Sequence, residues 1–244
     1  MSERLEIVAH RGWATRYPEN TMSAICGALA AGARYVEFDV QLSRDGVPVV
    51  IHDPTLERTA GRPECVMDLD WAALARIEVG PAPASERLSS LASVARALTA
   101  YAEATVFVEL KSESIDRFGT SNAVAAVLAA IAPIRERCVL TSFDDNALAE
   151  GRASGAQALA WVLSRYDDES LERARALAPE YLFCNHRKLP DNDRPLPTDG
   201  WHWVIYEVTT PELARSLAAR GVGMVETMAA GELLAALGAP GERG

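Results

Sequence analysis

Two carboxylates lie close together in the stretch from Tyr35 to Asp53, where the side chains with the clearest chemistry are found. Glu37 and Asp39 are two residues apart in an apolar run, so on a strand both side chains point to the same face. Burying an uncompensated carboxylate is very costly, whereas a divalent cation between the two would remove that cost. The pattern therefore predicts a metal site.

The same stretch predicts a β-hairpin that adds a histidine to this site. Asp45-Gly46 is a strong turn signal, and the β-prone run that follows it ends just before His52. In the expected register Leu42 pairs with Val47, and Glu37 then lies opposite His52. An imidazole beside the two carboxylates would give the metal site a neighbouring acid or base.

The composition indicates a globular protein with a sizeable core and excludes some classes of function. The 244 residues are 49% hydrophobic and 24% charged, and the net charge is -10. This charge argues against a nucleic-acid partner, because such surfaces concentrate Lys and Arg. The longest apolar segment, Ala123 to Ile134, is shorter than the ~20 residues that a bilayer span requires, so we expect no stable membrane insertion.

Cysteine usage and the N-terminus indicate a cytoplasmic location. The chain starts without a secretory signal. Its cysteines are scattered and form no Cys-x-x-Cys pair: Cys26, Cys65, Cys138 and Cys184. Such usage is typical of free thiols in a reducing compartment. The sequence does not indicate an oligomeric state.

Strand-like and helix-like segments alternate along the chain, with strands expected over Thr105–Leu110 and Cys138–Ser142. Asn20 or Thr21 would cap the helix that follows the first strand. Counted without the hairpin return, there are about eight strand-then-helix modules, the number that a (β/α)8 TIM barrel requires. A doubly wound open sheet is the structural alternative. No repeat or low-complexity linker marks a boundary, so we expect residues 1–244 to form one domain. Irregular residues 54–88 would form a short insertion or cap after the second strand and its hairpin.

The barrel prediction allows a check on the candidate site, because catalytic groups in such barrels lie at the C-terminal ends of strands. The predicted strands end at His10, at Glu37 with Asp39, and at Glu109 with Lys111. These side chains are therefore expected to meet at one end of the barrel.

A set of short motifs then points to a family. In order, they are His10-Arg11-Gly12, Pro18-Glu19-Asn20-Thr21, Glu37-Phe38-Asp39, Asp45-Gly46, His52-Asp53 and Glu109-Leu110-Lys111. With this order and spacing the chain resembles the glycerophosphodiester phosphodiesterase family over nearly its whole length. Leu56-Glu57-Arg58-Thr59 and Ser142-Phe143 add to the likeness. The family fold is a (β/α)8 barrel, which agrees with the count of modules.

The resemblance implies that three carboxylates bind a divalent cation, Mg²⁺ or Ca²⁺: Glu37, Asp39 and Glu109. Three acidic side chains without a cysteine suit a hard cation, which takes oxygen ligands.

The resemblance also implies an acid–base pair, His10 and His52, and phosphate contacts from Arg11 and Lys111. A phosphodiester needs its charge neutralised as more develops, and its departing alcohol needs a proton. The implied activity is metal-dependent hydrolysis of glycerophosphodiesters, which are small molecules, to glycerol phosphate and an alcohol.

Two late segments depart from the family pattern. Tyr206-Glu207-Val208-Thr209 stands where the family has a Trp-Thr-x-Asn run, and Glu226-Thr227-Met228 stands where it usually has Thr-Asp. By the resemblance, both segments lie at the rim of the barrel, where Glu207 or Glu226 would either repel a phosphate or select a cationic head group.

Two other functions stay open. One is a phospholipase D-like lipid phosphodiesterase on the same barrel, which the negative charge and the missing signal sequence disfavour. The other is a catalytically degenerate barrel that only binds a phosphorylated ligand or a partner.

Overall fold

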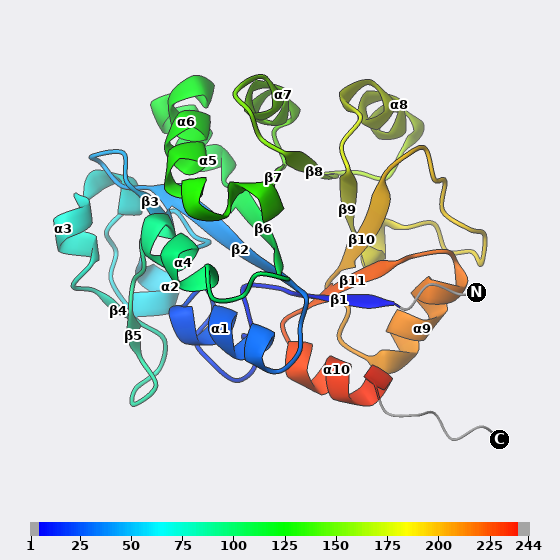
Figure 1. Ribbon diagram of the computed structural model, residues 1–244, viewed down its shortest axis with the longest axis horizontal. Helices are drawn as coiled ribbons and strands as arrows, with labels where there is room; N and C mark the ends of the chain where they lie inside the picture. Colours follow the sequence, from blue (N-terminus) through cyan, green and yellow to red (C-terminus); the bar gives the residue numbers. More distant parts are fainter. Residues whose placement is uncertain (1–4, 239–244) are drawn as a thin grey trace.

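A closed barrel of parallel strands forms the centre of the molecule, whose computed structural model describes residues 5–238 (Figure 1). The barrel strands are β1 (Glu6–Ala9), β2 (Tyr35–Leu42), β6 (Thr105–Leu110), β7 (Cys138–Ser142), β8 (Ala158–Val162), β9 (Tyr181–Asn185), β10 (His202–Tyr206) and β11 (Met224–Thr227). Each strand pairs in parallel with its neighbours, and β1 closes the ring by pairing with both β2 and β11. The predicted (β/α)8 barrel is confirmed, and the open sheet is excluded.

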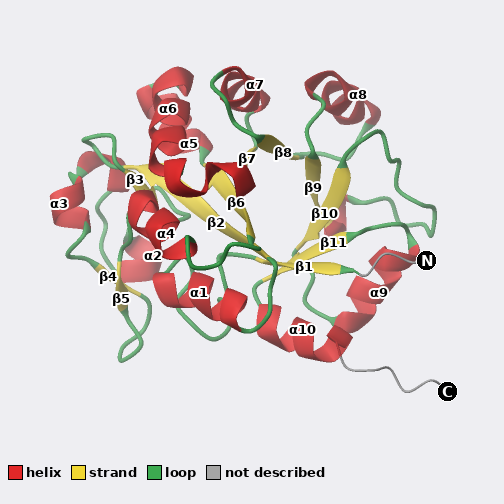
Figure 2. Cartoon of the chain, viewed as in Figure 1, coloured by secondary structure: helices red, strands yellow, loops and turns green. Residues whose placement is uncertain are grey.

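Helices surround the barrel between its strands, as Figure 2 shows. They are α1 (Met22–Ala30), α4 (Leu91–Leu98), α5 (Ser112–Phe118), α6 (Thr120–Ala130), α7 (Asp145–Ala153), α8 (Asp168–Leu177), α9 (Pro211–Ala219) and α10 (Ala230–Gly238), with 3-10 turns η2 (Ala132–Arg137) and η3 (His186–Lys188). Several begin at a side chain that accepts a backbone N–H, as at Thr21, Asp144 and Asp167. Local sequence thus decides where these helices start.

Side chains alternate along each strand between two apolar layers. One layer packs outward against the helices, and the other fills the barrel interior. Phe107 on β6 lies in the interior, with its ring centroid 4.9 Å from that of Tyr181 and 5.1 Å from that of Phe183. The aromatic interior is a packed floor below the mouth of the barrel.

Truncating this floor should be costly. We expect Phe107→Ala to lower the free energy of unfolding by about 3–5 kcal/mol, because it removes a fully buried ring and leaves a cavity. Denaturation in urea measures the change. The control Glu172→Ala, exposed on α8, should stay within about 0.5 kcal/mol of the parent. A Phe107 variant as stable as the control would contradict the packing described.

The hairpin after the second barrel strand is present, but the predicted register is wrong by one residue. In the antiparallel pairing of β2 with β3 (Pro48–Val50), Leu42 lies opposite Pro48 rather than Val47. The reason is a longer loop: the Ser43 N–H donates to the Val47 carbonyl, and the Val47 N–H donates to Ser43 Oγ. Consequently His52 lies beyond the end of β3 and is not the cross-strand partner of Glu37.

Residues 54–88 lie together on one side of the barrel (Figure 1). They contain α2 (Glu57–Ala60), η1 (Val66–Asp68), α3 (Trp71–Leu74) and a small hairpin of β4 (Glu78–Val79) and β5 (Glu86–Arg87). Their apolar side chains form a small buried cluster with Val49 and Ile51. This cluster fixes the segment against the first hairpin, close to His52.

The helices and the cysteines bear on the expectations about membrane insertion and free thiols. Among residues 5–238, none of the helices has the length and apolar character needed to cross a bilayer. All four cysteines are free thiols, and burial raises the pKa of Cys138 and of Cys184 to about 12.

Candidate active site

A small polar pocket of about 100 Å³ lies at the C-terminal end of the barrel, and we call it the mouth pocket. Its lining residues come from the ends of many strands: His10, Arg11, Asp39, His52, Glu109, Lys111, Phe143, Val162, Phe183, Tyr206, Glu207 and Glu226. Glu37 is buried beside it, with Oε2 at 4.0 Å from His10 Nε2. The structure therefore brings together all the candidate residues from the sequence.

Glu37, Asp39 and Glu109 form the carboxylate triad. Each offers an oxygen atom, and these atoms all lie within 4.8 Å of one another. Glu37 and Asp39 are almost completely buried, and among the described residues Glu37 Oε1 has no hydrogen-bond partner. An all-oxygen donor set with an unsatisfied buried oxygen fits a hard divalent cation.

Burial and mutual repulsion raise the pKa of two members of the triad. Burial, followed by the charges of Asp39 and Glu226, raises the pKa of Glu37 well above its usual value. Burial and Asp39 also raise the pKa of Glu109. Burial acts in the same direction on Asp39, but Lys111 and Arg11 prevail and lower its pKa to about 2. Asp39 is thus the firmly ionised member.

Two cations lie against the triad. Lys111 Nζ is 2.7 Å from Glu109 Oε1 and 3.3 Å from Asp39 Oδ1, and Arg11 Nε is 3.3 Å from Asp39 Oδ2. Burial acts to lower the pKa of Lys111, but Glu109 and Asp39 raise it above its usual value. Both cations are therefore charged and held at the mouth pocket.

Arg11 owes its position to a tight turn after β1. Arg11 has a φ of 54°, and Gly12 has a φ of 77°. A Cβ on Gly12 would lie 2.4 Å from the Ala24 backbone, so only glycine fits there. The Arg11 N–H can then donate to Glu37 Oε2 at 3.0 Å. The His10-Arg11-Gly12 motif therefore fixes the backbone conformation of this turn and also supplies two side chains of the site.

The two histidines have different environments. Burial, and then the positive charge of Arg11, lower the pKa of His10 to about 4, so its imidazole is neutral at pH 7. His52 is about one-third exposed, and its Nδ1 lies 2.6 Å from Asp53 Oδ1. Asp53 therefore occupies one ring nitrogen of His52 and leaves Nε2 for another partner.

An ion-pair chain joins His52 to Arg11 through Asp53, Arg58 and Glu19. Arg58 Nε donates to Asp53 Oδ2 at 2.7 Å, and its two terminal nitrogens donate to both oxygens of Glu19 at 2.8 and 2.7 Å. Glu19 Oε1 also accepts from Arg11 at 2.9 Å. Arg58 belongs to α2, so residues 54–88 take part in fixing the mouth pocket. Sequence reasoning noted the Arg58 motif but assigned it no such role.

Asn20 is another residue whose place the sequence did not reveal. Asn20 and Thr21 were both plausible caps for α1, and Thr21 is the one that caps it. Asn20 instead has a φ of 58° and is buried against Asp39. Its amide donates to Asp39 Oδ2 at 2.9 Å and accepts from the Asp39 N–H at 3.1 Å. It fixes the orientation of one triad carboxylate.

Glu226 was expected at the rim but lies inside the barrel. It is 3% exposed on β11 and lines the mouth pocket. Burial, and then the charges of Glu109 and Asp39, raise its pKa well above the usual value. Glu207, also expected at the rim, lines the same pocket but is exposed.

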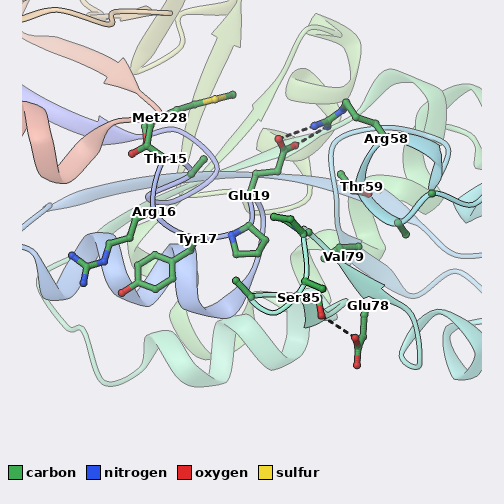
Figure 3. Close-up of a pocket in the computed structure, with 18 residues that line it drawn as sticks. Thr15, Arg16, Tyr17, Glu19, Arg58, Thr59, Glu78, Val79, Ser85 and Met228 are labelled. Carbon is green, nitrogen blue, oxygen red and sulfur yellow. Dashed lines mark hydrogen bonds and ion pairs between the residues drawn. The ribbon is translucent and has the colours of Figure 1, made fainter.

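A larger cleft of about 800 Å³, which we call the side cleft, lies between the segment after β1 and residues 54–88 (Figure 3). Figure 3 shows Glu19 and Arg58 joined on one wall, with Thr15 and Met228 together on another. The Glu19–Arg58 pair belongs to the ion-pair chain, so this wall lies on the side of the cleft that faces the mouth pocket.

The fold and the mouth pocket define a class: a (β/α)8 barrel with a cluster of three carboxylates and two histidines at the C-terminal ends of its strands. The sequence profile of the glycerophosphoryl diester phosphodiesterase family matches residues 10–222. The chain belongs to this family, and the resemblance predicted from its motifs is confirmed.

Curated relatives match over part of their length. A glycerophosphodiester phosphodiesterase from Bacillus altitudinis is 48% identical over 71 residues, which are 29% of each chain. One from Caldanaerobacter subterraneus is 33% identical over 146 residues, which are 58% of this chain and 59% of that one. The matched segments thus span less than two-thirds of these relatives.

Solved structures match over nearly the whole chain. A phosphodiesterase from Oleispira antarctica, in complex with the product sn-glycerol-3-phosphate, has a TM-score of 0.82 at 22% identity, covering 96% of this chain and 97% of that one. A glycerophosphodiester phosphodiesterase from Thermotoga maritima has a TM-score of 0.78 at 23% identity, covering 97% and 100%. At these identities the likeness establishes the fold.

Proposed function

We propose that this chain is a divalent-cation-dependent phosphodiesterase that hydrolyses glycerophosphodiesters to glycerol phosphate and an alcohol. The observation that carries the proposal is the meeting of the carboxylate triad, two histidines and two cations at one pocket. Family membership, and the glycerol phosphate bound to the Oleispira antarctica protein, support the same substrate class.

Glu37, Asp39 and Glu109 would hold the cation, either Mg²⁺ or Ca²⁺. When bound, such an ion neutralises the charge that develops on the phosphoryl oxygens. Arg11 and Lys111 border the same pocket and would contact the phosphate, because both carry a positive charge at the triad. Their carboxylate partners hold them in place before the substrate arrives.

We propose His10 as the base, since burial favours its neutral imidazole, which is the form that can accept a proton. The proton comes from the attacking oxygen, which belongs to water or to the neighbouring hydroxyl of the glycerol moiety. Attack by that hydroxyl gives a cyclic glycerol phosphate, and a water molecule must then open the ring to give glycerol phosphate. As the new P–O bond forms, the P–O bond to the alcohol breaks, and His52 donates a proton to the departing oxygen. Asp53 orients the His52 ring for this transfer.

The alcohol part of the substrate has room in the side cleft. This cleft adjoins the mouth pocket at the Glu19–Arg58 pair. It also adjoins the pocket at Met228, because the preceding residue, Thr227, accepts the His10 N–H with its backbone carbonyl. Its lining is mixed, with Tyr17 and Val79 beside the carboxylate of Glu78. Such a cleft accommodates alcohols of different size.

One assay tests the proposal against its two alternatives. Release of glycerol phosphate from glycerophosphocholine and glycerophosphoethanolamine is measured with and without Mg²⁺ or Ca²⁺. Cation-dependent turnover of these diesters is the expected result. Turnover of intact lipids alone would instead assign a phospholipase D-like activity, and tight binding without turnover would assign a barrel that only binds.

The ion-pair chain gives a prediction about a residue outside the mouth pocket. We expect Arg58→Met to lower kcat about 10- to 100-fold, because Asp53 and His52 lose their anchor and small misplacements of reacting groups cost up to about 10²-fold. Steady-state kinetics on glycerophosphocholine measures the loss. Arg62→Met is the matched control, since Arg62 pairs only with the neighbouring Glu64 in the described residues. Equal kinetics for both variants would contradict a positioning role for Arg58.

We also infer that residues 1–244 act as one domain in the cytoplasm, with 54–88 as an insertion. The cluster that joins 54–88 to Val49 and Ile51 supports the first statement, and the four free thiols support the second.

A further inference from the structure

Glu226 is a buried carboxylate that the proposed reaction has not used. It lies on β11 opposite Val8, and two residues after Met224, whose side chain fills the barrel interior. Because strand side chains alternate, Glu226 points inward as Met224 does. It is 3% exposed and lines the mouth pocket together with Asp39 and Glu109.

The carboxylate of Glu226 is incompletely satisfied. Among the described residues, Glu226 Oε1 has no hydrogen-bond partner, although it is fully shielded from solvent. The cations of the pocket are already engaged: Lys111 with Asp39 and Glu109, and Arg11 with Asp39 and Glu19. An unpaired polar group in such a place is costly unless something binds to it.

The charges around Glu226 indicate what would bind. Its neighbours include the negative charges of Glu109 and Asp39, and its own charge acts on Glu37. When all these carboxylates are ionised, the triad and Glu226 exceed Arg11 and Lys111 by two charges, without counting Glu207, which lines the same pocket but is exposed to solvent. One divalent cation supplies that difference. A neutral ligand or an anion would leave it uncompensated.

We propose that Glu226 is a fourth acidic member of the cation site and raises its affinity for the divalent ion. The inference rests on the cation site of the proposed function and adds a residue to it. Within residues 5–238, the group with oxygens mutually within 4.8 Å contains only the triad. Glu226 therefore acts by its charge across the mouth pocket and not as a member of that close group.

Cation affinity can be measured without any substrate. The full chain is freed of metal with a chelator, dialysed, and titrated with Mg²⁺ and separately with Ca²⁺ by isothermal calorimetry. We expect Glu226→Gln to weaken binding by about 10- to 100-fold, the range found when groups around the ligands of a metal are removed. Glu226→Asp, which keeps the charge, should retain most of the affinity. Glu212→Gln, exposed on α9, removes one charge elsewhere and should bind as the parent does.

Thermal unfolding gives a second readout and a check on folding. In chelator, Glu226→Gln should be at least as stable as the parent, because it removes a buried charge without a partner. Addition of Mg²⁺ or Ca²⁺ should then raise its Tm less than that of the parent. Glu226→Thr serves as a second neutral variant if the glutamine variant does not fold.

The possible outcomes test the role of Glu226 in cation binding separately from the phosphodiesterase activity on which the inference rests. Parent affinity in a folded neutral variant overturns the role of Glu226, and if KM then rises, Glu226 contacts substrate instead. Cation binding that depends on Glu226, in a protein without turnover, supports the inference while rejecting the phosphodiesterase. A parent chain that binds neither cation rejects both.

Discussion

Replacing either histidine of the mouth pocket should nearly abolish turnover of glycerophosphocholine. We expect His10→Ala and His52→Ala each to lower kcat by about 10²–10⁴-fold, the usual contribution of a positioned acid or base. The two losses have different causes. His10→Ala removes the buried, neutral imidazole that accepts a proton, and His52→Ala removes the imidazole that Asp53 orients with its Nε2 free to donate one. Steady-state rates of glycerol phosphate release measure both losses.

The control for these variants is another histidine outside the pocket. His202 is exposed and lies against Tyr181, with 5.6 Å between the ring centroids. His202→Ala should keep the parent kcat, and circular dichroism should show that all three variants are folded. Undiminished turnover in either mouth-pocket variant would reject the assignment of that histidine.

Removal of the cation is the second change with a large expected effect. After treatment with EDTA, kcat/KM should fall by about 10³-fold or more, because a bound metal contributes several kcal/mol to stabilising charge in a transition state. Adding Mg²⁺ or Ca²⁺ should restore the rate, and the ion that restores it better identifies the preferred cation. Full activity after exhaustive chelation would contradict cation dependence.

A matched pair of variants connects this loss to the triad. Asp39 is the member that Lys111 and Arg11 hold ionised, so Asp39→Asn removes the firmest negative charge. In that variant added cation should not restore activity. Asp116→Asn, exposed on α5, should respond to EDTA and to added cation as the parent does.

Much of the fold and the core of the site follow from local patterns. The Thr105–Leu110 and Cys138–Ser142 strands were predicted with the observed bounds, because apolar β-prone runs end there in polar residues. Once eight strands close into a barrel, His10, Asp39 and Glu109 must converge, since each lies toward a C-terminal end. Because side chains on a strand alternate between its two faces, Glu37 and Asp39, two residues apart, must lie on the same face.

The hairpin register was wrong because side-chain chemistry extended the loop. The Asp45-Gly46 signal located the turn correctly, and Gly46 has a φ of 77°. Ser43 Oγ, however, donates to Asp45 Oδ1 and accepts the Val47 N–H, so the loop holds one more residue than a pattern of apolar runs implies. A one-residue shift changes every cross-strand neighbour.

Contacts between distant segments were the least accessible to sequence reasoning. Arg58, Glu19 and Asp53 are charged residues in loops or a short helix, and no periodicity brings them together. Asn20 had an ordinary alternative as a helix cap. Glu226 is different, because alternation with the interior Met224 was visible in the sequence and could have placed it inside the barrel.

The ion-pair chain has a consequence for chimeric proteins. Arg58 is contributed by residues 54–88, while its partners Glu19 and Asp53 precede that segment. Transplanting the segment alone into another barrel would therefore leave its guanidinium facing foreign side chains. A graft that also transfers Glu19 and Asp53 would keep these ion pairs, so the three positions have to be moved together.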